Sequence, residues 1–145
     1  MPAIMRLTFC SIVFIICGCE PRLPETSGLD RFANSFKAAN QAETIHAMLD
    51  LYDLTGSGEQ TLQLLKPALQ NELGLPIQSI SFEPLRGAPE EKICFEFGGK
   101  QYGPTLEPKL RMRVQYATED GFSSLYTIGQ GTGGRWRIVS SRPMN

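Results

Sequence analysis

The chain has 145 residues, and its 14 lysines and arginines nearly balance its 15 aspartates and glutamates, which leaves a formal net charge of −1. This length allows one domain with a substantial hydrophobic core and is too short for two. A charge near zero argues against a nucleic-acid-binding protein, because such a protein needs an excess of basic residues on one face.

An apolar segment lies near the start of the chain. Residues Phe9 to Cys17 are apolar except for Ser11, and Arg6 precedes them. A permanent membrane-spanning helix needs about 20 apolar residues, so this segment is too short for one. It has the length of the hydrophobic part of an export signal, with Met1 or Met5 as the start of the chain.

The end of this segment, Ile16-Cys17-Gly18-Cys19, resembles the lipobox of bacterial lipoproteins. The resemblance implies that residues 1–18 are a signal peptide, that cleavage falls between Gly18 and Cys19, and that Cys19 carries acyl chains. Two or more such chains make a stable membrane anchor. We therefore expect an exported protein of the bacterial cell envelope, lipid-anchored at Cys19. Glu20, which follows the cysteine, leaves open whether the inner or the outer membrane holds it.

The four cysteines of the chain do not predict a disulfide. Cys10 and Cys17 belong to the expected signal peptide and Cys19 to the anchor, which leaves Cys94 alone. A single thiol cannot form an intrachain disulfide or a zinc cluster, so we expect no metal and no cofactor.

Residues 19–28 are expected to form the acylated cysteine and a short tether, kept extended by Pro21 and Pro24. Residues 20–28 reach about 30 Å at most. The single domain, expected over residues 29–145, should therefore lie close to the membrane surface.

Apolar residues at helical spacing predict three helices before residue 75. The first carries an apolar face of Leu29, Phe32, Ala33, Phe36 and Ala39. The second carries Ile45, Met48, Leu49 and Tyr52 and should end near Gly56. The third is expected over Gly58–Leu73, with Leu62, Leu65, Leu69 and Leu73 inward and Gly74 as its cap. Pro67 either kinks this helix or begins a second segment.

After Pro76 the apolar period changes from 3.6 to 2, which predicts strands. Expected strands contain Ile80 and Phe82, then Ile93, Phe95 and Phe97, then Leu110, Met112, Val114 and Tyr116, then Phe122–Ile128, and last Arg135–Ser140 with Trp136 and Ile138 on one face. Gly98-Gly99 predicts a two-residue hairpin turn into Lys100-Gln101-Tyr102. Gly129 to Gly134 superficially suggests a phosphate loop, but it joins two antiparallel strands, so we interpret it as a flexible hairpin.

This order of elements predicts an α+β fold, in which N-terminal helices pack on a curved antiparallel sheet. The helices should cover the apolar face. The opposite face should carry the charged residues Glu83, Glu96, Arg111, Arg113, Arg135 and Arg137. These residues either pair across strands or, for the arginines, face anionic lipid headgroups near the anchor.

Several segments in order resemble bacterial proteins of the nuclear-transport-factor-2-like superfamily. They are IHAMLDLYDLTG, LGLPIQSISFEPL, the FEF-GG-KQY hairpin and the final GGRWRIV, and together they span roughly residues 29–140. The resemblance implies a cystatin-like or nuclear-transport-factor-2-like roll, a cone-shaped fold with an apolar pocket. That superfamily includes isomerases, dehydratases and pure binding modules, so the fold alone does not choose a function.

His46, the single histidine, lies at helical spacing with Asp50 and Asp53, so an imidazole oriented by a carboxylate is one hypothesis. A solvated helix face is the favoured interpretation. Tyr52, Tyr116, Tyr126 and Trp136 are candidates to line a pocket. Core aromatics with polar ends at the rim are the alternative. Cys94 has no nearby histidine and no x-x-Cys partner in the sequence, so we interpret it as inert packing.

We therefore expect a membrane-anchored, non-enzymatic module that binds a small apolar ligand or another envelope protein, with no catalytic residue and no nucleic acid partner. One alternative is a small enzyme of the isomerase or dehydratase type that uses His46, Asp50 or Asp53. Another is a structural homodimer formed through the open face of the sheet.

Overall fold

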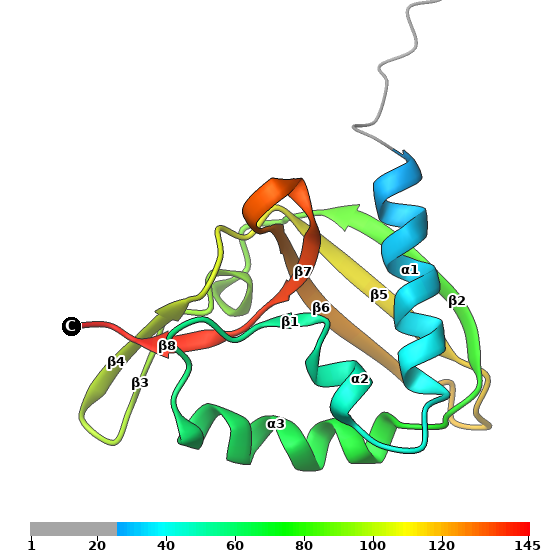
Figure 1. Ribbon diagram of the computed structural model, residues 1–145, viewed down its shortest axis with the longest axis horizontal. Helices are drawn as coiled ribbons and strands as arrows, with labels where there is room; N and C mark the ends of the chain where they lie inside the picture. Colours follow the sequence, from blue (N-terminus) through cyan, green and yellow to red (C-terminus); the bar gives the residue numbers. More distant parts are fainter. Residues whose placement is uncertain (1–25) are drawn as a thin grey trace, which may run out of the picture.

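The computed structural model describes residues 26–145, in which three helices cover one face of a curved, mostly antiparallel sheet (Figure 1). The predicted α+β roll is therefore confirmed. The lipobox and Cys19 lie outside the described residues. Within the described part of the chain, no helix is long and apolar enough to cross a bilayer.

Helix α1 (Thr26–Asn40) begins three residues before the predicted start of the domain, so the predicted tether over residues 19–28 is too long. The helix buries Phe32, Phe36 and Ala39 along one face, as the apolar stripe predicts. Helix α3 (Glu59–Glu72) buries Leu69 and runs through Pro67 as one helix, so the alternative of a second segment is wrong. Gly74 follows α3 with a φ of 80°, a left-handed conformation that glycine adopts without strain.

The predicted second helix is mostly wrong. Helix α2 covers only His46–Leu49, and the chain then forms strand β1 (Tyr52–Asp53). Tyr52 pairs in parallel with Ile138, and the Ile138 amide donates to the Leu51 carbonyl at 2.9 Å. Tyr52 and Ile138 are 86 residues apart in the sequence, and their pairing replaces the last turn of the predicted helix. Because Tyr52 is buried in both arrangements, the apolar stripe could not tell them apart.

The main sheet has the order β1-β7-β6-β5-β2. Its other strands are β2 (Ile77–Pro84), β5 (Leu110–Tyr116), β6 (Ser123–Gln130) and β7 (Trp136–Val139). Met112, Val114 and Tyr116 alternate along β5 and are fully buried under the helices, as predicted. The core therefore lies between α1, α2 and α3 and the concave face of this sheet.

A second sheet of three short strands, ordered β3-β4-β8, lies beside the first (Figure 1). It contains β3 (Phe95–Phe97), β4 (Lys100–Pro104) and β8 (Ser141–Pro143). The Gly98-Gly99 turn joins β3 to β4 as predicted, with φ values of 59° and 72°. The expectation of one continuous meander is wrong, because the chain leaves β7 at Ser140 and enters this second sheet.

Two single-turn helices replace parts of predicted strands and turns. The turn η1 (Pro89–Lys92) ends at Ile93 with a φ of 52°, so β3 begins two residues later than expected. Phe95 and Phe97 are 42% and 47% exposed and do not join the core face. The turn η2 (Thr132–Gly134) occupies the end of the predicted glycine-rich hairpin, because β6 extends to Gln130.

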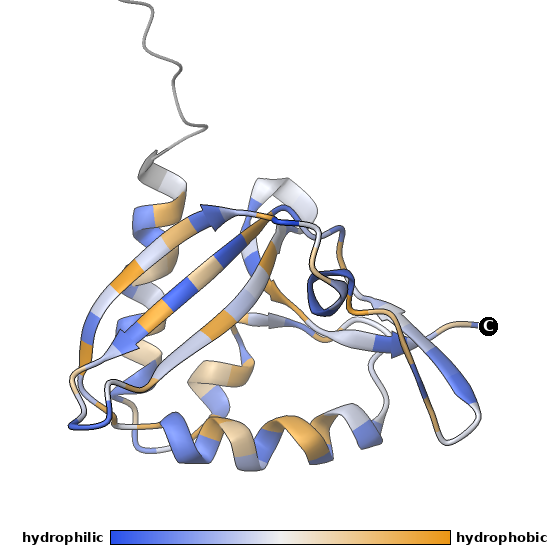
Figure 2. Cartoon of the chain, turned by 180° about the vertical axis from the view of Figure 1, so that it is seen from behind, coloured by the Kyte–Doolittle hydropathy of each residue, from blue (hydrophilic) through white to orange (hydrophobic). Residues whose placement is uncertain are grey.

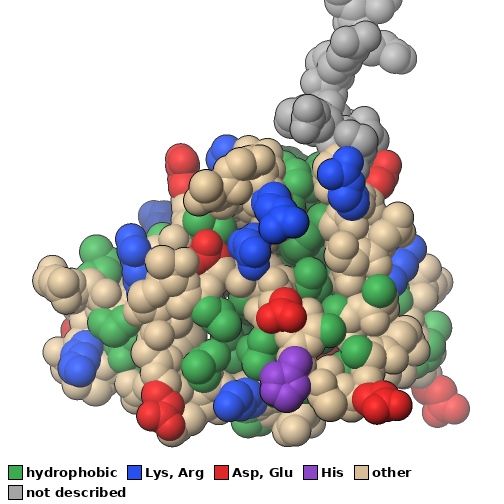
Figure 3. All heavy atoms as spheres, viewed as in Figure 1, with side chains coloured by type: hydrophobic (Ala, Val, Ile, Leu, Met, Phe, Trp, Pro, Cys, Tyr) green, Lys and Arg blue, Asp and Glu red, His purple; other side chains and the backbone are tan. Residues whose placement is uncertain are grey.

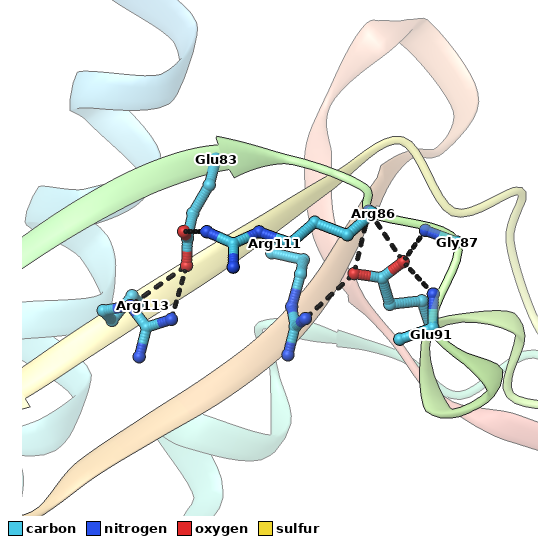
Figure 4. Close-up of polar contacts among 7 residues, drawn as sticks. Glu83, Arg86, Gly87, Glu91, Arg111 and Arg113 are labelled. Atoms are coloured by element: carbon cyan, nitrogen blue, oxygen red, sulfur yellow. Dashed lines mark hydrogen bonds and ion pairs between the residues drawn. The ribbon is translucent and has the colours of Figure 1, made fainter.

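The face of the main sheet opposite the helices is open and alternates hydrophilic and apolar residues (Figure 2). There the Arg113 guanidinium lies 2.9 Å from the Glu83 carboxylate, as cross-strand pairing predicts, while Arg111 pairs with Glu91 on η1 (Figure 4). The predicted position of Glu96 on this face is wrong, because Glu96 lies in the second sheet, where its carboxylate accepts a hydrogen bond from Gln101.

Candidate functional site

A groove of about 420 Å³ lies between the first turns of α1, the segment after α2 and the start of β7. Figure 3 shows this side of the molecule, where basic side chains gather around a hollow beside α1. The lining residues are Gly28, Arg31, Phe32, Ser35, Asp50, Leu51, Gly133, Gly134, Arg135, Trp136 and Arg137.

The η2 turn places one wall of this groove. Gly133 and Gly134 have φ values of 73° and 74°, so the chain reverses tightly between β6 and β7. The Gly131 amide donates to the Arg135 carbonyl at 2.9 Å and closes the turn. The glycine-rich segment therefore acts as a tight turn that sets the position of Arg135 and Trp136.

Three arginines line the groove, and we call Arg31, Arg135 and Arg137 the groove arginines. Arg137 is half-buried, and its Nη1 donates to the main-chain carbonyls of Asp50 at 2.9 Å and Tyr52 at 3.3 Å. Arg31 and Arg135 are exposed. Among residues 26–145, none of the three lies within 4.0 Å of a carboxylate oxygen. Asp50 supplies the only acidic side chain among the described lining residues, so the groove is electropositive.

A second hollow of about 380 Å³ adjoins the groove and shares Arg135 and Arg137 with it. Asp53 lines this hollow, and its Oδ1 accepts a hydrogen bond from the Thr55 amide at 3.0 Å. The two hollows together form one extended polar depression on this face of the domain.

The groove also has aromatic walls. Phe32 is 6% exposed and packs in the core, while Trp136, the single tryptophan of the chain, is half-buried at the groove. These rings exclude water from one side of the depression. Electrostatic interactions of the arginines are stronger against such an apolar wall than in open water.

A separate, partly buried polar cluster lies between α3 and the main sheet. The Glu72 carboxylate accepts hydrogen bonds from the Tyr116 hydroxyl at 3.0 Å, from the Ser124 hydroxyl at 2.7 Å and from the Tyr126 hydroxyl. All three donors come from β5 and β6, so the cluster joins the C-terminal end of α3 to the sheet.

Burial sets the pKa values of three tyrosines in and beside this cluster. Burial, with the nearby Glu72 carboxylate as a further cause, raises the pKa of both Tyr52 and Tyr116 well above the ordinary value. Burial raises the pKa of Tyr126 furthest, and negative charge on Tyr52 and Glu72 would raise it more. These phenols therefore stay protonated and act as hydrogen-bond donors.

The residues predicted for catalysis do not come together. His46 is exposed, and its Nδ1 lies 3.0 Å from the Thr44 hydroxyl. Asp50 lines the groove and Asp53 lines the adjoining hollow, while His46 lines neither. In the part of the chain that the structure describes, the imidazole forms no hydrogen bond with either aspartate.

The four aromatic residues predicted for a pocket separate into different sites. Trp136 lines the groove and Tyr52 lines the adjoining hollow. Tyr116 and Tyr126 line neither, because their hydroxyls point to Glu72. Cys94 is exposed, and its thiol lies 3.3 Å from the Lys92 carbonyl.

Sequence reasoning missed Arg31 and Glu72. It also placed Arg135 and Arg137 on the open face of the sheet, which is wrong, because both line the groove. Glu72 follows Leu65 and Leu69 at helical spacing, so a carboxylate continues a buried apolar stripe. That pattern is a signal for a buried polar partner. Arg31 gave no such signal, because its role depends on contact between α1 and β7.

Comparison of the chain with protein-family models, with curated proteins and with solved structures gave no match. Over residues 26–145, no group of three histidine, cysteine, aspartate or glutamate side chains is placed to hold a metal ion.

Proposed function

We propose that the protein is a lipid-anchored binding module of a bacterial cell envelope, and that the groove between α1 and β7 is its binding site. The observation that carries this proposal is a groove with three arginines and one tryptophan beside the first turns of α1. The α+β roll supports the resemblance to nuclear-transport-factor-2-like binding modules, and membership of that superfamily is part of the proposal.

The position of the groove in the chain fits an anchored protein. Gly28, which lines the groove, lies in the first turn of α1, and α1 begins at Thr26, seven residues after Cys19. A fully extended stretch of that length spans about 25 Å at most. An acylated Cys19 would therefore hold the groove close to the lipid headgroups. A ligand in or near the membrane is the one that such a site would meet.

Binding is favoured over catalysis by the arrangement of the titratable groups. An enzyme of the isomerase or dehydratase type needs a general base in contact with a substrate pocket. His46 is exposed outside both hollows, and Asp50 stands at the groove without an imidazole beside it. Asp50 and Asp53 remain the residues through which a catalytic alternative would act.

Homodimerisation through the open face of the sheet is disfavoured by its charge. Glu83, Glu91, Arg111 and Arg113 form ion pairs across this face, whereas the centres of stable interfaces are depleted of charged residues. Light scattering of the detergent-solubilised chain should therefore show a monomer, and a stable dimer that Arg113→Glu disrupts would support the structural alternative.

The anchor is tested by replacing Cys19 with alanine and fractionating the cells. We expect the Cys19→Ala chain to lose acylation and to leave the membrane fraction under high salt, while a matched Cys17→Ala chain stays in it. Incorporation of a labelled fatty acid into wild type, but not into Cys19→Ala, is the second measurement. Unchanged membrane retention of a Cys19→Ala chain that carries no fatty-acid label would refute the anchor.

A further inference from the structure

We infer that the groove arginines bind the phosphate group of a phosphoester that also carries a hydroxyl group. The inference rests on the proposed function, because it assigns a ligand class to the proposed binding site. Two sources have this chemistry, the glycerophosphate headgroup of an anionic phospholipid and a soluble phosphoester.

Two sets of arginines in this small domain differ in their partners. Arg111 and Arg113 each lie 2.9 Å from a carboxylate oxygen. The groove arginines have no carboxylate within 4.0 Å among residues 26–145. Three guanidinium groups that line one hollow, outnumber its single aspartate and form no ion pair among the described residues make a site for a bound anion.

Main-chain carbonyls hold the Arg137 side chain in place. Its Nη1 donates to the carbonyls of Asp50 and Tyr52, which fixes a side chain that lines both hollows. A guanidinium carries five N–H donors, and these contacts use one nitrogen. The remaining donors are oriented before any ligand arrives, which lowers the entropy cost of binding.

The groove also contains an acceptor for the hydroxyl group of the ligand. Asp50 lines the same groove as the arginines, so a ligand that is anionic along its whole length would be repelled there. A carboxylate accepts hydrogen bonds from a hydroxyl. A phosphate toward the arginines and an alcohol toward Asp50 would satisfy both, with Trp136 excluding water from one side.

The test uses the full chain in a neutral detergent and follows the fluorescence of Trp136, the only tryptophan, while glycerol 3-phosphate is added. We expect a saturable change at millimolar concentrations or below. Arg135→Gln should weaken binding about tenfold or more, the range expected for a hydrogen bond between charged groups. Arg135 is exposed and the change removes no ion pair among the described residues, so the fold should be kept.

Arg142→Gln is the matched control, because it removes the same charge from β8, outside both hollows. Its affinity should equal that of wild type. No saturable change in wild type, or equal weakening by the two substitutions, would overturn the inference, since the second result would reflect net charge and not a site.

Nanodiscs identify the source of the phosphoester. If the ligand is a lipid headgroup, phosphatidylglycerol nanodiscs should already shift the Trp136 emission and abolish the response to glycerol 3-phosphate, while phosphatidylcholine nanodiscs should leave it intact. If the ligand is soluble, the Trp136 emission in either nanodisc should respond to glycerol 3-phosphate as it does in detergent. If Cys19→Ala stays in the membrane fraction while glycerol 3-phosphate still binds to wild type, the anchor is wrong and the anion site stands. If Cys19→Ala leaves the membrane but glycerol 3-phosphate does not bind to wild type, only the anion site is wrong.

Discussion

The side-chain amide of Asn40 donates a 2.9 Å hydrogen bond to the main-chain carbonyl of Glu72, which joins the C-terminal ends of α1 and α3. In return, the Gly74 amide donates to the Asn40 carbonyl at 2.8 Å. Two carbonyls that helix ends leave without intrahelical partners are thereby satisfied inside the fold. The same Glu72 binds the tyrosines of the sheet through its side chain, so this pair connects α1, α3, β5 and β6.

Asn40→Ala should therefore destabilise the fold far from the groove. The residue is fully buried, and the substitution removes its hydrogen bond to the Glu72 carbonyl, which keeps only the Leu75 amide as a donor. It also removes the acceptor of the Gln41 side-chain amide. We expect the free energy of unfolding to fall by about 1–3 kcal/mol. Urea unfolding followed by circular dichroism measures it, with Asn34→Ala on the exposed side of α1 as the control. Equal stability of the two variants would contradict this role.

The buried tyrosines predict a loss of stability at high pH. Because burial raises the pKa of Tyr52, Tyr116 and Tyr126 in the folded state, the unfolded chain releases protons first, above about pH 10. The stabilisation is fully present below that pH and falls as the pH rises beyond it.

Absorbance of tyrosinate and circular dichroism, measured together against pH, test this sign. We expect these three tyrosines to ionise only as the chain unfolds, and Tyr126→Phe to reduce the slope of stability against pH. Ionisation of all the tyrosines near pH 10 with the secondary structure intact would show that they are not buried donors.

Because of the Glu91 carboxylate, we expect the stability of the fold to fall at low pH as well. Burial alone would raise its pKa, but the backbone amides of Arg86, Gly87 and Ala88 and the Arg111 guanidinium together hold the pKa below its ordinary value (Figure 4). A lowered pKa gives stability that is present above the ordinary pKa of glutamate, about 4.3, and is lost as the pH falls through the folded value.

Glu91→Gln should remove this dependence and lower the melting temperature at neutral pH, because an amide cannot pair with Arg111 and offers only one acceptor oxygen. Glu90→Gln, at the exposed neighbouring position, is the control and should leave both unchanged. Thermal unfolding between pH 3 and 7 measures the two effects. A wild-type-like acid transition in Glu91→Gln would assign it to other carboxylates.

Much of the fold could be predicted from local patterns. The stripe through Phe32 and Phe36 gives α1, and the alternation from Leu110 to Tyr116 gives β5, because each pattern arises from one element packing on one core. The Gly98-Gly99 turn is equally local. These features depend on residues that are close in sequence.

What could not be predicted depends on distant pairing. Strand β1 exists because Tyr52 meets Ile138, and the second sheet exists because Tyr102 meets Pro143. The groove has the same origin, since it brings Arg31 of α1 beside Arg135 and Arg137 after the η2 turn. A charged side chain in a single sequence looks like any solvated surface residue until its neighbours are known.

Gly129 on β6 is a position where a single methyl group should test the packing of the loop before β5 against the main sheet. A Cβ atom there would lie 2.5 Å from the Glu107 carbonyl oxygen, a main-chain atom that cannot move without shifting the loop. The adjacent Lys109 amide donates to the Ile128 carbonyl at 2.9 Å, which holds that loop in place. We expect Gly129→Ala to lower the free energy of unfolding by about 1–3 kcal/mol, the usual cost of overpacking.

Gly131→Ala is the matched control, because its Cβ would have no neighbour closer than 3.9 Å and its φ of −85° suits alanine. Urea unfolding of the two variants beside wild type decides the prediction, and a Gly129→Ala chain as stable as Gly131→Ala would show that the 105–109 loop yields to the added methyl.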